Sequence, residues 1–346
     1  MEEWKEYKLG DVLTIKYGKG HKQLADGDIP IYGSGGIMRY GERSLYDGPS
    51  ILIPRKGSLN NVIYADKPFW TVDTMFWSII NDSIANPLFV YYSICKKDFA
   101  SLNVGSAVPS LTVPVIEDID ILLPSKATQD KVVSVLKSLD DKIELNRHIN
   151  DNLEQQAQAL FNEMFPHITE GENMIGDLIM PKRGKGLLSK NAIKGDIPVV
   201  AGGIEPATYH NQANTTAPVL TIAASGANAG YINLWHIPVW ASDSSYIDDS
   251  ITPNVYFWYI MLKKRQQEIF DAQVGSAQPH IYPKHIAELP MNVVFVEKIA
   301  EYNEIVTPIF EKKGQLFLES KRLTSLRDTL LPKLMSGELK INDINN

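Results

Sequence analysis

Residues 126–165 read KATQDKVVSVLKSLDDKIELNRHINDNLEQQAQALFNEMF, a stretch that contains no glycine and no proline. Apolar side chains recur through it at alternating spacings of four and three residues, the pattern of a helix packed on another helix. The positions of this ladder are Val132, Leu136, Leu139, Ile143, Asn146, Asn150, Leu153, Ala157, Leu160 and Met164. A helix of about 40 residues is roughly 60 Å long. The stretch therefore predicts one long helix that needs a partner helix.

A second ladder lies 170 residues further along the chain. Its positions are Tyr302, Val306, Ile309, Lys313, Leu316, Ser320, Leu323, Arg327, Leu330 and Leu334. Most of these side chains are apolar, so we expect the two helices to pair antiparallel as a coiled coil. Pro308 and Gly314 are expected to bend the second helix.

Polar residues occupy the middle of both ladders. Asn146 and Asn150 lie in the first, and Lys313 and Ser320 lie in the second. In an antiparallel pair these polar layers would meet near the centre. We hypothesise that they set the register of the helices, as buried polar positions do in coiled coils.

The duplicated ladder belongs to a repeat that covers nearly the whole chain. The matched motifs are Gly10-Asp11 with Gly176-Asp177, Gly18-Lys19-Gly20 with Gly184-Lys185-Gly186, Gly27-Asp28-Ile29-Pro30 with Gly195-Asp196-Ile197-Pro198, Gly35-Gly36 with Gly202-Gly203, Trp70 and Asp73 with Trp240 and Asp243, and Val104-Gly105-Ser106-Ala107 and Pro109 with Val274-Gly275-Ser276-Ala277 and Pro279. The offset drifts from 166 to 170, as expected of a duplication with small loop insertions.

Each copy mixes predicted strands and helices. Residues 51–53 and 219–222 indicate buried strands followed by glycine-rich turns, and residues 119–123 and 288–295 also indicate strands. Residues 89–97 and 255–267 indicate helices, each opened by an Asn-Pro or Pro-Asn pair.

The predicted fold class is mixed α/β, with two similar globular heads separated by two long antiparallel helices in a pseudo-two-fold dumbbell. The first head covers residues 1–125 and the first spacer helix residues 126–166. The second head covers residues 167–295, and residues 296–346 form the second helix and a C-terminal tail.

The composition is that of a globular protein, with 44% hydrophobic and 22% charged residues, and 346 residues suit about two domains. The start of the chain lacks the apolar core of a signal peptide, and the longest apolar run, residues 255–262, is too short to cross a bilayer. Cys95 is the only cysteine, which excludes an intrachain disulfide. These features predict a cytoplasmic protein.

The net charge of −7 and the pI near 5.6 argue against a free-standing DNA-binding protein. The objection weakens if partner subunits cover the DNA backbone or if the positive charge is local. The charge is local in both copies: Lys16, Lys19, Lys22, Arg39, Arg43, Arg55 and Lys56 in the first, and Lys182, Arg183, Lys185, Lys190 and Lys194 in the second.

The order of head, helix, head and helix resembles the specificity subunit of type I restriction-modification enzymes over essentially the whole chain. Three stretches carry the resemblance. They are the openings of the heads, residues 4–11 and 174–178; the two Gly-Ser-Ala-x-Pro turns; and the tail at residues 326–339, LRDTLLPKLMSGEL. The tail is the most specific of the three and is similar to the end of the family's second conserved helix.

The resemblance implies a function and a set of partners. In that family each head reads one half of a split double-stranded DNA site, and the helices set the spacer between the halves. The helices also dock two methyltransferase (modification) subunits, which use S-adenosylmethionine, and restriction subunits with translocase and nuclease activity join them. The chain itself would bind no cofactor and no metal and would catalyse nothing. Because the two heads differ in sequence, the full site should be asymmetric.

The Gly-Ser-Ala-x-Pro turns are the first candidate DNA contacts. Small residues let a rigid backbone approach DNA closely. The candidates are Gly105 and Ser106 in the first copy and Gly275 and Ser276 in the second, followed there by His280 and Tyr282. The residues after the two turns differ, which suits two different half-sites. The alternative is that each is an ordinary tight turn.

The loop after the central strand supplies the second candidates: Arg55, Lys56, Ser58 and Asn60 in the first copy, and Ser225 and Asn228 in the second. Arginine and lysine favour guanine edges and asparagine favours adenine, although Arg55 could instead clamp a phosphate or form a surface ion pair. Phosphate contacts, or solvated surface charges, are predicted at Arg39, Arg43, Lys182, Arg183 and Lys185, and Lys19 and Lys22 are further candidate DNA-binding residues. The tryptophans at 70, 77, 235, 240 and 258 are predicted to lie in the core.

Two other classes of protein remain as alternatives. Asn86-Pro87-Leu88-Phe89 faintly resembles the catalytic loop of adenine methyltransferases, but no glycine-rich cofactor loop accompanies it, so we interpret it as a helix start. The histidines show no metal-ligand spacing. A duplicated scaffold or ligand-binding protein without DNA readout fits the heptads and the charge, but does not explain the tail or the paired turns.

Overall fold

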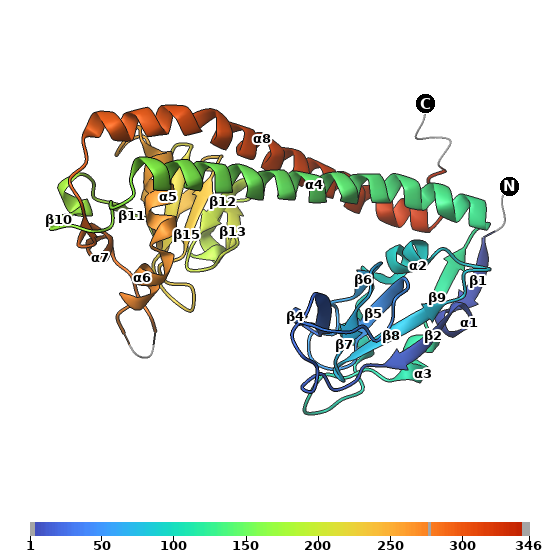
Figure 1. Ribbon diagram of the computed structural model, residues 1–346. Coiled ribbons are helices and arrows are strands. Elements are labelled where there is room, and N and C mark those ends of the chain that lie inside the picture. The colour runs from blue at the N-terminus through green and yellow to red at the C-terminus, as the bar shows by residue number, and fades with distance from the viewer. Residues whose placement is uncertain (1–3, 276–277, 341–346) are drawn as a thin grey trace. The chain divides into compact units, whose positions relative to one another are not determined.

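The computed structural model describes residues 4–275 and 278–340, which form two compact units. Unit 1 comprises Met1–Ile143 and Arg322–Asn346, and unit 2 comprises Glu144–Lys321. Two long helices, α4 (Lys126–Met164) and α8 (Val296–Met335), contribute one part to each unit. The rest of each unit is a mixed α/β head: head 1 runs from β1 to β9 and head 2 from β10 to β18 (Figure 1).

Head 1 is built on three small sheets with the strand orders β2-β8-β5-β6, β4-β3-β7 and β1-β9. The strands are β1 (Lys5–Lys8), β2 (Leu13–Tyr17), β3 (Ile29–Gly33), β4 (Gly36–Gly41), β5 (Ser50–Pro54), β6 (Ile63–Ala65), β7 (Trp70–Thr71), β8 (Met75–Ile80) and β9 (Asp120–Leu123). The helices are α1 (Leu9–Val12), α2 (Pro87–Ile94), α3 (Val113–Glu117) and the 3-10 turn η1 (Phe99–Leu102). Among the strands described in head 1, the β3–β7 pair is parallel and the other pairs are antiparallel.

Head 2 repeats this topology, with the orders β11-β17-β14-β15, β13-β12-β16 and β10-β18, and again a single parallel pair, β12–β16. The strands are β10 (Asn173–Met174), β11 (Lys182–Arg183), β12 (Ile197–Val200), β13 (Thr208–His210), β14 (Val219–Ala223), β15 (Ile232–Trp235), β16 (Trp240–Ala241), β17 (Ser244–Ile247) and β18 (Pro290–Met291). The helices are α5 (Val255–Lys264), α6 (Gln266–Asp271), α7 (Pro283–Ala287), η2 (Ile175–Asp177) and η3 (Ser189–Asn191). The sequence repeat is therefore a repeat of topology.

The strands predicted at residues 51–53 and 219–222 are confirmed as β5 and β14. Every residue of β5 and β14 is buried, because each strand lies inside its four-stranded sheet. The strand predicted over 288–295 is wrong for most of its length, since only Pro290–Met291 pairs with another strand. Its partner β10 is two residues long, so the apolar residues beyond Met291 have no strand to pair with and Val293 and Phe295 are exposed.

Asparagine caps α2 as the Asn-Pro pair predicts. The Asn86 side-chain oxygen accepts hydrogen bonds from the backbone N–H groups of Leu88 (2.9 Å) and Phe89 (3.3 Å). Pro87 occupies the first turn, where its missing N–H costs nothing. The interpretation of this motif as a helix start is confirmed.

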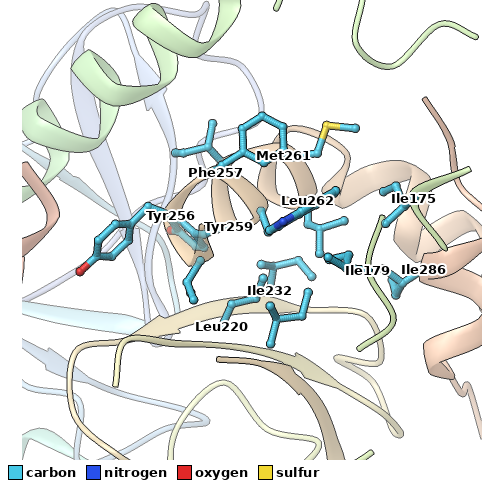
Figure 2. Close-up of a cluster of buried hydrophobic side chains, with 14 of the residues drawn as sticks. Ile175, Ile179, Leu220, Ile232, Tyr256, Phe257, Tyr259, Met261, Leu262 and Ile286 are labelled. Atoms are coloured by element: carbon cyan, nitrogen blue, oxygen red, sulfur yellow. The ribbon is translucent and has the colours of Figure 1, made fainter. Parts of the chain in front are cut away.

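The core of unit 2 lies between its sheet and the long helices. Residues 255–262 of α5 are all buried, which is expected of a helix covered on every side. Figure 2 shows Leu262 of α5 above Ile232 and Leu220 of the sheet. On the other side α5 contacts Phe161 of α4, whose ring lies 5.5 Å from that of Phe257.

The two long helices pair antiparallel within each unit. In unit 2 the Tyr302 hydroxyl donates to the Ala157 carbonyl (2.9 Å), and Asn146 donates to Ser320 (3.3 Å), so α8 runs backward as α4 runs forward. In unit 1 Val132 and Leu136 share a core with Leu331 and Leu334. All twenty predicted ladder positions are buried or half-buried. The predicted fold class, two similar mixed α/β heads with two long antiparallel helices, is confirmed.

The polar layers follow the prediction in part. The Asn146 amide meets Ser320 and also donates to Glu319 (2.8 Å), whereas Lys313 pairs with Glu154 rather than with an asparagine. The side-chain oxygens of Asn146 and Asn150 are buried without a hydrogen-bond partner among the described residues.

Glycine at 314 lets head 2 approach α8. A Cβ atom there would lie 2.8 Å from Cγ of His236, closer than nonbonded carbon atoms allow. The helix runs without interruption through both Pro308 and Gly314.

Candidate nucleic-acid interface

Two loops of head 1 that are far apart in sequence are held together by backbone hydrogen bonds. Gly57 N–H donates to the Pro109 carbonyl (3.1 Å), and Leu111 N–H donates to the Arg55 carbonyl (2.9 Å). The loop after the central strand β5 therefore lies against the Gly-Ser-Ala-x-Pro turn. Gly57 has φ +89°, a conformation that glycine adopts readily.

Head 2 builds the same arrangement. Gly226 N–H donates to the Pro279 carbonyl (3.1 Å), and Ile281 N–H donates to the Ala224 carbonyl (2.9 Å). Gly226 has φ +82°. We call this pair of loops the paired-loop edge: residues 55–61 with 103–110 in head 1, and residues 224–229 with 273–275 and 278–280 in head 2. The sequence indicated these loops as separate candidates, and the fold brings them together twice.

A third loop joins the edge in both heads. In head 1 the Asn61 side chain donates to the Ser34 carbonyl (2.9 Å), and a Cβ on Gly57 would lie 2.9 Å from the Ser34 hydroxyl oxygen. In head 2 a Cβ on Gly202 would lie 2.3 Å from the Ser225 carbonyl oxygen. The duplicated glycine pairs of the repeat thus mark the hairpin turn that packs beside the paired-loop edge.

Arg55 lies at the paired-loop edge of head 1. Its Nη1 donates to the Asp73 carbonyl (3.1 Å), and its guanidinium carbon lies 5.6 Å from the centre of the Tyr17 ring. Stacking on an aromatic face is favourable for a guanidinium and fixes its plane.

Arg183 lies on β11, beside the paired-loop edge of head 2. Its Nη2 donates to the Asp243 carboxylate (2.5 Å), and the Ser225 hydroxyl donates to the other oxygen of the same carboxylate. The two side chains of the ion pair are 40% and 39% exposed. A carboxylate between a guanidinium and a hydroxyl holds both in place.

The two Gly-Ser-Ala-x-Pro turns and the residues after them expose different groups to solvent. The Asn103 side-chain oxygen accepts the N–H groups of Gly105 and Ser110 (both 2.8 Å), so the Gly105 N–H is used inside the turn while Ser106 is exposed. Gly275 is exposed with φ +96°, and Ser276 lies outside the described residues. The rings of His280 and Tyr282 are nearly parallel with centres 5.9 Å apart, and Tyr282 is 45% exposed.

Several of the candidate DNA contacts are exposed to solvent. The side chains of Lys19, Lys22, Lys56 and Lys185 are exposed, and so is Ser58. Lys22 lines a hollow together with Ser34 and Asp73.

Other predicted contacts are engaged within the protein. The Arg39 guanidinium donates to the carbonyls of His21 and Leu24 (both 2.8 Å) and pairs with Asp26 (3.0 Å). These bonds give Arg39 a structural role in the loop that precedes β3.

The remaining candidates make one or two contacts each. Arg43 lies over the Trp70 ring (5.9 Å), and the Lys182 ammonium donates to the Ser250 hydroxyl (3.1 Å). Asn60 binds the loop at Asp98 (3.1 Å), and Asn228 is half-buried in the turn before β15. The role of each candidate as a DNA contact stays a prediction.

Two of the predicted core tryptophans have a duplicated role. The indole N–H of Trp70 donates to the Lys19 carbonyl (3.0 Å), and that of Trp240 donates to the Lys185 carbonyl (2.8 Å). Each tryptophan therefore holds the Gly-Lys-Gly turn of its own head. Trp70, Trp235 and Trp258 are buried, as predicted, and the other two are half-buried.

Each head is fixed to the long helices by a cluster of three polar side chains that the sequence did not mark. In unit 1 the Tyr92 hydroxyl donates to Asp140 of α4 (2.6 Å), which pairs with Arg327 of α8 (2.7 Å). Burial, reinforced by Asp140, raises the pKa of Tyr92 far above its usual range. No local pattern marks such a cluster, because its three members lie on three elements.

Unit 2 holds its head with the same three kinds of group. The Tyr259 hydroxyl donates to Glu154 of α4 (2.8 Å), which pairs with Lys313 of α8. Burial disfavours the Glu154 carboxylate, but Lys313 and Tyr259 outweigh it and lower the pKa of Glu154.

His236 makes unit 2 sensitive to acid. Burial, reinforced by Lys313 and opposed by Glu154, lowers the pKa of His236 to about 4, from 6.5 in an unfolded chain. Between these values the unfolded chain binds a proton that the folded unit does not, so stability is complete above about pH 6.5 and falls as the pH drops.

We expect the wild-type chain to lose about 2 kcal/mol of unfolding free energy at unit 2 between pH 7 and pH 5 through this histidine. In His236→Gln most of that loss should disappear in urea unfolding curves recorded at both pH values. His148→Gln, at an exposed position of α4, is the control and should keep the wild-type pH dependence. An unaltered pH dependence in His236→Gln would contradict the assignment.

No helix in residues 4–275 and 278–340 is both long and apolar enough to cross a membrane. In the same residues, no cluster of three or more His, Cys, Asp or Glu side chains could hold a metal ion.

Comparisons with known proteins agree on one family. Residues 1–155 match the family model described as the type I restriction modification DNA specificity domain. A putative type I specificity subunit of Mycoplasma pneumoniae is 26% identical over 96% of each chain. The MjaIX specificity subunit of Methanocaldococcus jannaschii is 24% identical over 98% of this chain and 89% of its own.

A solved structure shares the fold. The crystal structure of the type I restriction-modification S subunit from M. genitalium superposes with a TM-score of 0.63 at 21% identity, and the match covers 96% of both chains. The match of residues 1–155 to the family model and the relatives that cover nearly the whole chain make this chain similar to the specificity subunits of type I restriction-modification systems.

Proposed function

We propose that this chain reads DNA sequence for a type I restriction-modification system, with each head binding one half of a split, asymmetric site. The observation that carries the proposal is the paired-loop edge. Both heads build it with the same backbone hydrogen bonds, and each surrounds it with different side chains. The same backbone arrangement with different side chains suits recognition of two different half-sites, because side chains that contact base edges supply sequence specificity.

The helices suit the role of a spacer. Two modules on one face of a duplex must lie about 34 Å apart, or a multiple of that distance. The helices α4 and α8 are continuous over 39 and 40 residues, and helices of this size span roughly 60 Å. A continuous helix pair converts chain length into base-pair spacing, and we propose that it also docks two methyltransferase subunits.

The chemistry belongs to the partners in this proposal. The methyltransferase subunits would bind S-adenosylmethionine and methylate adenine, and restriction subunits would add translocation and cleavage. This chain would supply no catalytic group and would work in the cytoplasm, where the host DNA lies. A net charge of −7 is compatible with DNA binding if the partners provide much of the grip on the phosphates.

The test is to co-express the chain with the neighbouring methyltransferase subunit and to sequence methylated adenines in the host DNA. We expect one split, asymmetric motif that disappears when this chain is deleted. Exchanging residues 167–295 for the second head of another specificity subunit should change one half of the motif and leave the other intact.

The matched control exchanges residues 1–125, which should change the opposite half. Methylation that persists without the chain, with no methyltransferase co-purifying, would refute the proposal. A duplicated scaffold or ligand-binding protein without DNA readout would then be the function to test.

A further inference from the structure

Each head has an arginine beside the same strand position, Arg55 from the loop after β5 in head 1 and Arg183 from β11 in head 2. Strand register makes Tyr17 the counterpart of Arg183, since Tyr17 pairs with Phe76 on β8 and Arg183 pairs with Ser245 on β17. In head 1 the Arg55 guanidinium lies over the ring of Tyr17 itself. The Arg55 guanidinium, which follows the end of β5, therefore lies over the residue of head 1 whose backbone position corresponds to that of Arg183 on β11 in head 2.

The aspartates of the repeat hold both guanidinium groups. Asp73 accepts from Arg55 through its backbone carbonyl, and Asp243 accepts from Arg183 through its carboxylate. Among the described residues neither arginine makes a further hydrogen bond, so each keeps most of its five N–H donors for a ligand. A guanidinium that is already oriented loses little entropy when it binds.

At Arg183 the surroundings favour a base over a phosphate as the ligand. The Asp243 carboxylate beside Arg183 neutralises the arginine and would repel a phosphate. Each arginine also has an exposed lysine near it in the sequence, Lys56 in head 1 and Lys185 in head 2. These lysines could bind the phosphates of the DNA backbone. Guanine presents O6 and N7 as two adjacent acceptors in the major groove, and the arginine fork matches them in a bidentate pair.

We propose that Arg55 and Arg183 are the specificity-determining residues for a guanine in each half-site, Arg55 in the half read by head 1 and Arg183 in the half read by head 2. This inference rests on the proposed function. It adds that both half-sites contain a guanine whose recognition depends on one named side chain.

The test uses the full chain in complex with its methyltransferase subunits. The readout is the methylated motif, together with methylation rates on duplexes that differ at a single base pair. Arg55→Lys keeps the positive charge but loses the two-pronged guanidinium. At one guanine position of the first half-site we therefore expect the preference for guanine over the other bases to fall about 5- to 150-fold. Arg183→Lys should do the same in the second half-site only.

Lys67→Arg is the matched control. Lys67 is an exposed residue of head 1 that is not among the candidate DNA contacts, and its charge-preserving substitution should leave preference at every position unchanged. Melting temperatures equal to wild type show that each variant is folded.

The outcomes separate the two proposals. A wild-type complex that methylates no split motif defeats the proposed function itself. If wild type has the split motif but Arg55→Lys and Arg183→Lys keep it unchanged, or weaken methylation equally on all duplexes, the arginines contact phosphate or nothing and the inference is overturned.

Discussion

Phe161→Ala is expected to lower the unfolding free energy of unit 2 by about 3–5 kcal/mol, the range for a buried phenylalanine truncated to alanine. The Phe161 side chain is fully buried where α4 meets α5 and α8. Its ring contacts Phe165 (5.2 Å between centres), Phe257 (5.5 Å) and Tyr302 (5.5 Å), so alanine leaves a cavity that three other rings line.

Urea unfolding followed by aromatic circular dichroism measures this loss. Phe317→Ala is the matched control, because Phe317 lies on α8, is 37% exposed and should cost less than about 1 kcal/mol. Equal costs for the two variants would contradict the packing described for α4, α5 and α8. Because Phe161 supports head 2, we also expect Phe161→Ala to weaken recognition of the second half-site before the first.

Glu154→Leu is expected to destabilise unit 2 by about 3–5 kcal/mol at pH 7, because it removes one partner of a largely buried ion pair. The Lys313 side chain is only 12% exposed, and the substitution leaves its ammonium without the carboxylate. The Tyr259 hydroxyl also loses its acceptor. Since the pKa of Glu154 is lowered in the folded unit, wild type should lose this contribution as the pH falls below about 4.5.

Urea unfolding of a double-mutant cycle measures the coupling. Adding Lys313→Met to Glu154→Leu removes the unpaired charge, so the double variant should be more stable than Glu154→Leu alone. Glu144→Leu is the control: this exposed residue pairs with Arg147 on the surface, and its loss should cost less than about 1 kcal/mol. Strictly additive single and double variants would show that Glu154 and Lys313 do not interact.

Some of the fold can be predicted from sequence because its signals are local. The ladders in α4 and α8 follow from residue spacing alone, and the Asn86 cap and the strand at residues 51–53 need no distant partner to be recognised. The same reasoning failed at residues 292–295. There the apolar composition indicated a strand, but whether a strand forms depends on a pairing partner that a single segment does not reveal.

The candidate site was predictable only in pieces. The Gly-Ser-Ala-x-Pro turns and the loop at Arg55 were each found from composition, and Asp73 and Asp243 were visible as matched residues without an assigned role. Arg183 was expected to contact phosphate, and its ion pair with Asp243 gives the reason to consider a base instead.

The duplication, the helix ladders and the family resemblance follow from the sequence alone, since repeated motifs and residue spacing can be recognised without knowing which residues contact one another. The fold was needed to show that Arg55 lies over Tyr17, that Arg183 pairs with Asp243, and that Glu154 binds both Tyr259 and Lys313. These contacts join residues from separate strands and helices. They depend on strand order and helix register, which cannot be read from the spacing of residue types along the sequence.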